Sequence, residues 1–291
     1  MEAFSYVAPR SLDEAYAHLS NGKRTAVLAG GTDIIVQLRE NRKHCDQVLD
    51  VKHIPDLMAM GFEADGTLAI GAATACVTIY EDPEVRKRVP ALVDSATIIG
   101  GTQIQGRASI GGNICNSGPA ADSSPSLMAL GARLRIGSKA GTREVAVEDF
   151  FTGPGRNVLA EGELLLQIRI PAPAANSSSA YLRFIPRNEM DIAVVGAGVS
   201  LTLNAAGDRI EAARVAIGAV GPTPLMVPDA ATALIGQAPT AETFAKAGDA
   251  SSAKASPISD MRGSIAQRKH LSKVLTVRAL ENALNRIKET R

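Results

Sequence analysis

Two short segments of the chain combine adjacent glycines with small polar residues, a combination that could bind phosphate. The first is Val27-Leu-Ala-Gly-Gly-Thr-Asp33, and the second is Ala108-Ser-Ile-Gly-Gly-Asn113. Glycine pairs let the backbone adopt positive φ and let a ligand approach the N–H groups closely. Successive N–H groups in such turns form a concave site for anions. Two of these turns converging on one diphosphate would suit a dinucleotide cofactor, although either pair could instead be no more than a tight turn.

A short buried strand and a following helix are expected to position the first glycine pair. Residues 25–29 have the apolar pattern of such a strand, and the pattern becomes helical over residues 34–40. Thr32 or Asp33 could cap this helix, whose N-terminus would then face the same anion. The second pair is expected to follow a similar strand at residues 108–110.

The elements around the two pairs are predicted to be short. Ser11 can cap a helix in a first βαβ-type layer of about 55 residues. Further strands are expected at residues 4–6, 48–51, 68–70, 76–79, 133–136 and 164–170. Helices are expected at residues 86–98 and 126–130.

The last third of the chain has a different pattern. Residues 171–179 are rich in proline and serine and resemble a linker. Beyond them, strands at residues 193–203 and 210–217 flank a turn at 204–207, which indicates a β-hairpin. Helices are predicted at residues 241–250 and 265–287, the second with a stripe of leucines.

Other motifs that carry chemistry are absent or incomplete. Residues 195–201 begin like Gly-x-Gly-x-x-Gly, but Leu201 stands at the third glycine position and a strand, not a helix, is predicted there. The sequence has no Gly-x-x-x-x-Gly-Lys phosphate loop and no Gly-x-Ser-x-Gly elbow. Cys45, Cys76 and Cys115 lack the short spacing of zinc or iron–sulfur sites, and the four histidines lack metal-ligand spacing. We therefore expect reduced thiols and no metal site.

Composition excludes several classes of partner. The 291 residues include 31 Lys+Arg and 30 Asp+Glu, so the chain lacks the basic excess with which proteins attract nucleic acid or anionic membranes. No apolar run approaches the roughly 18 residues of a membrane-spanning helix. The opening residues are acidic and interrupted, unlike a signal peptide. We expect a globular, cytoplasmic protein with one large domain or two to three smaller ones.

Taken in order, the glycine segments and several other motifs resemble one known family. The chain resembles the FAD-binding medium subunit of the molybdenum hydroxylases, the family of the carbon monoxide dehydrogenase and xanthine dehydrogenase flavoproteins. The resemblance covers essentially the whole chain. It rests on Phe4-x-Tyr6-x-x-Pro9-x-Ser11-Leu12, Ala29 to Asp33, Ser109 to Asn113 with Asn116 to Asp122, Arg187 with Asp191 to Ala193, and Asp260-x-Arg262-Gly263-Ser264 with Arg268.

The resemblance implies an α+β fold. A two-subdomain FAD-binding fold of the vanillyl-alcohol-oxidase type would come first, followed by an α+β C-terminal domain. We expect FAD-binding subdomains at residues 1–56 and 57–177, and the C-terminal flavoprotein domain at residues 178–291.

The resemblance also assigns contacts with FAD to particular residues. Those near the diphosphate would be Leu28, Ala29, Gly30, Gly31, Thr32, Asp33, Ser109, Gly111, Gly112 and Asn113. Cys115 would lie against the cofactor. Asp122 would accept hydrogen bonds from hydroxyls of the cofactor chain, with a helix cap before Ser126 as the alternative. Those near the isoalloxazine would be Ile99, Gly100, Leu165 and Arg183; some family members have an aromatic residue in place of Ile99 and lysine in place of Arg183.

In this family, hydroxylation takes place at a molybdenum cofactor on a large subunit, and electrons pass through iron–sulfur clusters on a small subunit to the flavin. The resemblance therefore implies these two partners, assembled as a dimer of heterotrimers, and an external electron acceptor. It implies no catalytic side chain here, because the cofactor carries the redox chemistry. The alternatives are a self-contained flavoenzyme, for which we find no catalytic acid with basic substrate-binding residues, and a scaffold that has lost FAD, against which the intact glycines argue.

Overall fold

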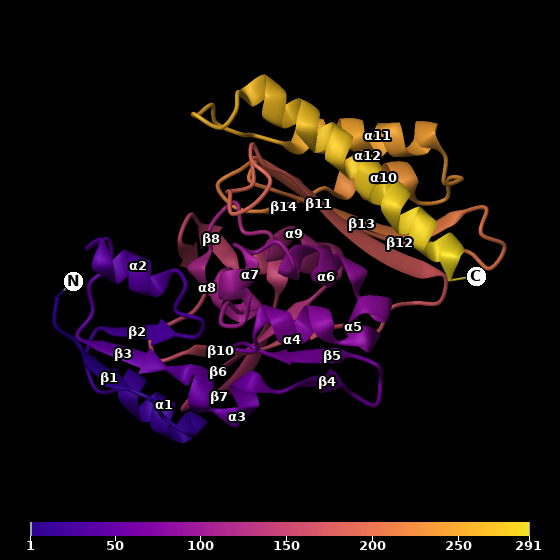
Figure 1. The fold of residues 1–291 in the computed structure, drawn as a ribbon. Coiled ribbons are helices and arrows are strands. Elements are labelled where there is room, and N and C mark those ends of the chain that lie inside the picture. Colours follow the sequence, from indigo (N-terminus) through magenta and orange to yellow (C-terminus); the bar gives the residue numbers. More distant parts are fainter. Residues whose placement is uncertain (1, 291) are drawn as a thin grey trace.

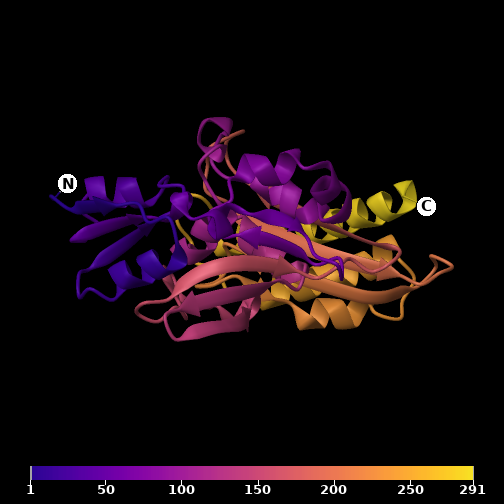
Figure 2. The same ribbon diagram turned by 90° about the horizontal axis from the view of Figure 1, so that it is seen from below.

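The computed structural model describes residues 2–290, arranged as three units along the chain. The N-terminal unit lies at one end of the molecule, and the C-terminal sheet and helices pack against the middle unit (Figures 1 and 2). Within residues 2–290, no helix is both long and apolar enough to cross a membrane.

The N-terminal unit is a parallel three-stranded sheet with two helices. Its strands are β1 (Ser5–Val7), β2 (Thr25–Leu28) and β3 (Gln47–Asp50), in the order β1-β3-β2. Helix α1 (Leu12–Leu19) follows β1, and helix α2 (Ile34–Arg39) follows β2. The predicted βαβ layer is confirmed, as is the cap, because Ser11 Oγ accepts a hydrogen bond from the Glu14 N–H at 3.2 Å. The short helices η1 (Val51–His53) and α3 (Pro55–Met58) lead into the next unit.

The middle unit is built on an antiparallel sheet whose central strand comes last in the sequence. The strands are β4 (Met60–Phe62), β5 (Leu68–Gly71), β6 (Arg133–Ser138), β7 (Gly141–Ala146) and β10 (Leu164–Ile170), in the order β4-β5-β10-β6-β7. The predicted strand at residues 164–170 is confirmed with the same bounds. The helix η2 (Val147–Asp149) and the hairpin of β8 (Phe151–Gly153) and β9 (Arg156–Asn157) lie between β7 and β10.

Six short helices pack on the middle sheet. They are α4 (Cys76–Glu81), α5 (Pro83–Arg88), α6 (Pro90–Ala96), α7 (Thr102–Gln105), α8 (Ile110–Asn116) and α9 (Ser123–Ala129). The strands predicted at residues 76–79 and 108–110 are wrong, because helices α4 and α8 begin there. A short apolar run fits either element, and tertiary packing decides between them. The single helix predicted at residues 86–98 is divided, because Pro90 cannot donate the hydrogen bond that would continue α5.

The C-terminal unit is an antiparallel sheet covered on one face by helices (Figure 1). Its strands are β11 (Ser177–Phe184), β12 (Val195–Leu203), β13 (Ile210–Gly218) and β14 (Leu225–Met226). Its helices are α10 (Pro228–Leu234), α11 (Ala241–Lys254) and α12 (Ile265–Glu289). The predicted hairpin and both terminal helices are confirmed. The linker-like stretch is shorter than expected, because its serines 177–179 already pair with β12.

Separate apolar cores fill the middle and C-terminal units. The larger core of the middle unit lies between its sheet and helices, with Phe150, Ile110 and Leu127 fully buried. The C-terminal core lies between strands β11–β13 and helices α10–α12. A smaller core joins the N-terminal unit to β10 through Leu49, Leu164 and neighbouring side chains. The domain limits at residues 56 and 177 stay predictions.

Candidate functional site

A cavity of about 550 Å³ lies between the N-terminal and middle units. Its first wall is formed by β2, the turn after it and α2. Its second wall is formed by α8 and the segment that leads into β10. Of the predicted site residues, the cavity lining includes Ala29, Gly30, Gly31, Thr32, Asp33, Ile99, Ser109, Gly111, Gly112, Asn113, Cys115 and Leu165. Both predicted glycine turns therefore face one space.

In the first turn, the two glycines have different structural roles. A Cβ atom on Gly30 would lie 2.5 Å from the carbonyl oxygen of Arg107, so this glycine allows close approach of two backbone segments. Gly31 has φ +80°, a conformation that other residues adopt only with strain. The Arg107 guanidinium donates to the Gly30 carbonyl at 3.2 Å and ties the turn to the opposite wall.

The side-chain cap predicted for α2 is wrong. Asp33 occupies the N-cap position, but neither its carboxylate nor Thr32 makes a capping hydrogen bond. The Asp33 side chain instead faces the open cavity. Partial removal from water raises its carboxyl pKa, and Arg42 opposes that shift. The first wall therefore carries an acidic group as well as backbone N–H groups.

The second glycine pair lies inside the first turn of a helix, not at the end of a strand. Ser109 caps α8, since its Oγ accepts from the Gly112 N–H at 3.1 Å. A Cβ atom on Gly111 would lie 2.3 Å from the Ala72 carbonyl oxygen, so Gly111 is needed for backbone packing. A Cβ on Gly112 would meet Ser109 Oγ at 3.0 Å and Ala29 at 3.9 Å, in the gap between the two turns.

Beyond the turns, the lining changes from polar to apolar. Asn113 Oδ1 accepts from Ser123 Oγ at 2.5 Å, which fixes one polar side chain at the wall. Burial raises the pKa of the Cys115 thiol to about 12, so it remains protonated. Ile99, Leu164 and Leu165 form an apolar surface that suits a flat aromatic ring. The cavity thus has two glycine turns at one end and an apolar region beyond them.

Four predicted residues, Leu28, Gly100, Asp122 and Arg183, lie outside the cavity lining. Asp122 and Arg183 instead form a buried ion pair of 2.8 Å, and the Tyr181 hydroxyl donates to the second oxygen of Asp122 at 2.8 Å. Burial raises the Asp122 pKa to about 6, although Arg183 and Tyr181 act in the opposite direction. The alternative role as a helix cap is wrong, because the Asp122 carboxylate makes no capping bond. Direct contact of these four residues with FAD stays a prediction.

Sequence reasoning missed several residues of the lining. Gln37, Arg42, Lys43, Asn116 and Glu163 all face the cavity. Gln37 stands one helical turn after Asp33, and that spacing is a signal that could have placed it on the same face. Asn116 belongs to the segment that follows the second glycine pair. Glu163 comes from a distant part of the chain, and no local pattern indicates its position.

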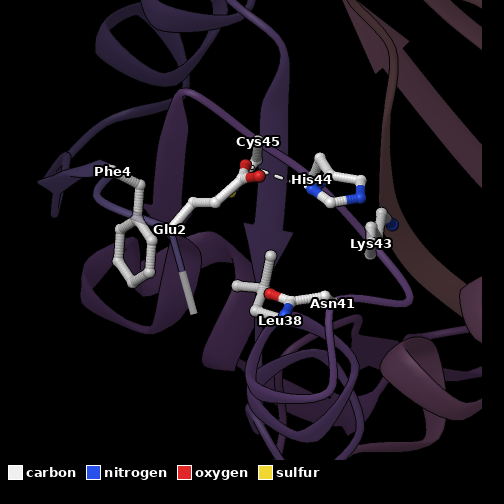
Figure 3. Close-up of a pocket in the computed structure, with 7 residues that line it drawn as sticks. All are labelled: Glu2, Phe4, Leu38, Asn41, Lys43, His44 and Cys45. Atoms are coloured by element: carbon white, nitrogen blue, oxygen red, sulfur yellow. Dashed lines mark hydrogen bonds and ion pairs between the residues drawn. The ribbon is translucent and has the colours of Figure 1, made fainter.

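A second, much smaller crevice of about 10 Å³ lies at the edge of the N-terminal unit (Figure 3). Phe4, Leu38 and Cys45 line it, and a 3.1 Å ion pair joins His44 to Glu2. It has room for about one water molecule. Among residues 2–290, no group of three or more histidine, cysteine or acidic residues could hold a metal ion.

The fold and the large cavity define the class of dinucleotide-binding proteins, with two glycine turns on facing walls. The chain belongs to the family with the FAD-binding domain of molybdopterin dehydrogenases, which its residues 2–173 match. Residues 180–283 match the C-terminal domain of CO dehydrogenase flavoproteins. It is an FAD-binding subunit of the molybdenum hydroxylase family, with an α+β fold. The resemblance found in the sequence is confirmed, and so is FAD as the cofactor.

Individual relatives agree over nearly the full length. The carbon monoxide dehydrogenase medium chain of Hydrogenophaga pseudoflava is 31% identical, with 96% of each chain covered. The xanthine dehydrogenase FAD-binding subunit of Escherichia coli O157:H7 is 30% identical, also with 96% of each covered. The solved carbon monoxide dehydrogenase of H. pseudoflava superposes with a TM-score of 0.93, at 31% identity and 98% coverage of each chain. These relatives are chains of dehydrogenases, so this chain is the flavoprotein component of an oxidoreductase.

Proposed function

We propose that the chain is the electron-transfer subunit of a molybdenum hydroxylase complex. It would take electrons from iron–sulfur clusters on a small partner subunit and pass them to an external acceptor. Its partners would be that small subunit and a large subunit with the molybdenum cofactor, assembled as a dimer of heterotrimers. The observation that carries the proposal is the cavity with two facing glycine turns and an apolar region, in a chain whose relatives are named as medium chains and FAD subunits.

The residues present fit FAD at this cavity. The first turn would hold the diphosphate through its backbone, because Gly31 has the positive φ that turns N–H groups toward one point. Gly112 would leave room for the diphosphate on the facing wall, since a side chain there would occupy the gap between the turns. Ile99 and Leu165 would support the isoalloxazine. When bound, FAD supplies two-electron redox chemistry.

The protein would contribute binding and orientation without a general base or nucleophile. The Cys115 thiol is held protonated by burial, which makes it a poor nucleophile. The described residues also contain no metal-ligand cluster, so iron–sulfur chemistry would belong to partner chains. All three cysteines are free thiols, which supports a cytoplasmic location.

The test compares the isolated chain with the reconstituted complex. Purified alone, the chain should retain non-covalent FAD and should not hydroxylate a heterocycle, an aldehyde or carbon monoxide. Addition of the molybdenum and iron–sulfur subunits should produce substrate-dependent flavin reduction, which is measured as loss of absorbance at the flavin band. Efficient substrate turnover by the isolated chain, with metals rigorously absent, would instead establish a self-contained flavoenzyme.

A further inference from the structure

In addition to the Arg107–Gly30 contact, a hydrogen bond between two side chains joins the helices that form the walls of the cavity. Gln37 on α2 donates from Nε2 to Asn116 Oδ1, at the end of α8, over 3.0 Å. The two residues are 79 positions apart in the chain, and both line the cavity. Each also belongs to the helix that begins at one of the glycine turns. The bond therefore connects the two segments that would enclose the diphosphate.

The Asn116 side of this bond is firmly fixed. The Asn157 amide donates to the Cys115 carbonyl at 3.0 Å and to Ser117 Oγ at 3.1 Å. The Gly155 N–H donates to the Ser117 carbonyl at 2.9 Å. These three bonds hold both neighbours of Asn116 against the β8–β9 hairpin. The second wall thus presents the Asn116 amide from a rigid support.

The Gln37 side is held more weakly. Helix α2 has six residues, lacks a side-chain N-cap bond and leaves Ile35 49% exposed. Leu38 is its one buried side chain, in a core cluster of five buried residues. Short helices with few tertiary contacts open at low free-energy cost. The first wall is therefore the one that can move away when the hydrogen bond between Gln37 and Asn116 breaks.

From this arrangement we propose that Gln37 and Asn116 form a clasp that controls how fast FAD enters and leaves. The inference rests on the proposed placement of FAD in this cavity. The clasp joins two parts of the same chain and must break whenever FAD passes. It therefore raises the free-energy barrier to both entry and release of FAD. Its loss should increase the association and dissociation rates by the same factor and leave the dissociation constant unchanged. A side chain that bound FAD directly would instead change the dissociation constant.

The experiment measures FAD association and release by stopped-flow fluorescence for Gln37→Leu, Asn116→Leu and the double variant. Each single variant should raise both rates about 5-fold, the size expected for one hydrogen bond between neutral groups. The double variant should show the same increase, because either substitution alone already removes the bond. Gln237→Leu, an exposed glutamine on the C-terminal unit, is the matched control and should leave both rates unchanged.

A variant in which the two side chains are exchanged controls for structural effects of the substitutions that are unrelated to the hydrogen bond. Gln37→Asn combined with Asn116→Gln keeps the combined length of the two side chains. It should restore the wild-type rates of FAD association and release. A larger dissociation constant with an unchanged association rate would overturn the clasp in favour of direct contacts with FAD. So would rate increases that multiply in the double variant. Unchanged rates in all variants would also overturn it. Failure of the wild-type chain to bind FAD would instead contradict the proposed site.

Discussion

The middle unit meets its two neighbours in different ways. Against the C-terminal unit it makes buried or half-buried ion pairs, Arg183–Asp122 and Arg286–Asp94, both at 2.8 Å. Close backbone packing adds to these, since a Cβ on Gly198 would lie 2.4 Å from the Pro125 carbonyl oxygen. Against the N-terminal unit it has the apolar contact around Leu164 and a large cavity crossed by few hydrogen bonds.

This difference assigns stability of the fold to the C-terminal junction and cofactor binding to the N-terminal junction. The C-terminal junction is held by ion pairs between the protein's own side chains and by close backbone contact. The N-terminal junction leaves backbone turns and an apolar wall facing open space, where the groups of a dinucleotide can complete the contacts. Substitutions at the first junction should therefore change the free energy of unfolding, and those at the second should change FAD binding.

The largest effect is expected from Arg183→Met. It leaves the Asp122 carboxylate buried without its counterion, since the two side chains are 8% and 10% exposed. Loss of one partner of a buried pair costs about 3–5 kcal/mol in the free energy of unfolding. Urea denaturation at pH 8 would measure it, with Arg183→Lys as the charge-conserving control. A stable variant that loses FAD would contradict the comparison and place Arg183 at the flavin.

A second effect concerns the pH dependence of stability. Burial raises the Asp122 pKa from 3.8 to about 6, so the folded state binds this proton more tightly than the unfolded state. The resulting stability is fully present below pH 3.8 and is lost as the pH rises through about 6. The loss should amount to about 3 kcal/mol. Subtracting the pH profile of Asp122→Asn from that of the wild type would isolate it; a flat difference would mean that Asp122 does not titrate in this range.

A third effect belongs to the cavity. Gly31→Val and Gly112→Val should each abolish FAD retention while the chain stays folded. At Gly31, a branched residue must adopt φ +80° at a cost of about 1–2 kcal/mol, and its Cβ would press against the Ile35 side chain at 3.0 Å, so the turn would be distorted. Flavin absorbance after gel filtration, together with circular dichroism, would show both properties. Normal flavin content in either variant would remove that turn from the site.

Gly111→Val provides the contrast within the same helix. Its Cβ would lie 2.3 Å from the Ala72 carbonyl oxygen, so the side chain would collide with that backbone. We expect loss of folded protein in this variant, measured by thermal unfolding. If Gly111→Val unfolded no more easily than Gly112→Val, the division between a packing glycine and a ligand-facing glycine would be wrong.

The smallest effect is expected from Ser11→Ala, at the far side of the N-terminal unit. Loss of the cap of α1 should lower the free energy of unfolding by about 1 kcal/mol. FAD affinity should not change, because Ser11 does not line the cavity. Isothermal titration with FAD would verify this, and weaker binding would indicate that the whole N-terminal unit tightens around the cofactor.

The elements that could be predicted from sequence are those with a clear local signal. Alternation identified the strand at residues 133–136, and the turn at residues 204–207 identified the hairpin. The short runs at residues 76–79 and 108–110 could not be assigned in this way, because strand and helix share such patterns over so short a length. Their helical form depends on packing against the middle sheet.

The candidate site was predicted where it depends on backbone turns and missed where it depends on distant partners. Glycine pairs are visible as local patterns, so both turns were found. The pairing of Asp122 with Arg183 joins residues 61 positions apart, and nothing in either segment specifies it. Glu163 reaches the cavity for a similar reason, through the fold of the middle sheet.

Strand order in the middle sheet has a consequence for synthesis on the ribosome. Strand β10 lies between β5 and β6, although β4 to β7 are all translated before it. Until residues 164–170 emerge, the sheet exists as two hairpins, β4–β5 and β6–β7, whose inner edges are unpaired and can pair with other chains. Such non-local pairing also forms slowly. If FAD occupies the cavity that Leu164 and Leu165 line, as proposed, the nascent chain acquires it only after this last strand is in place.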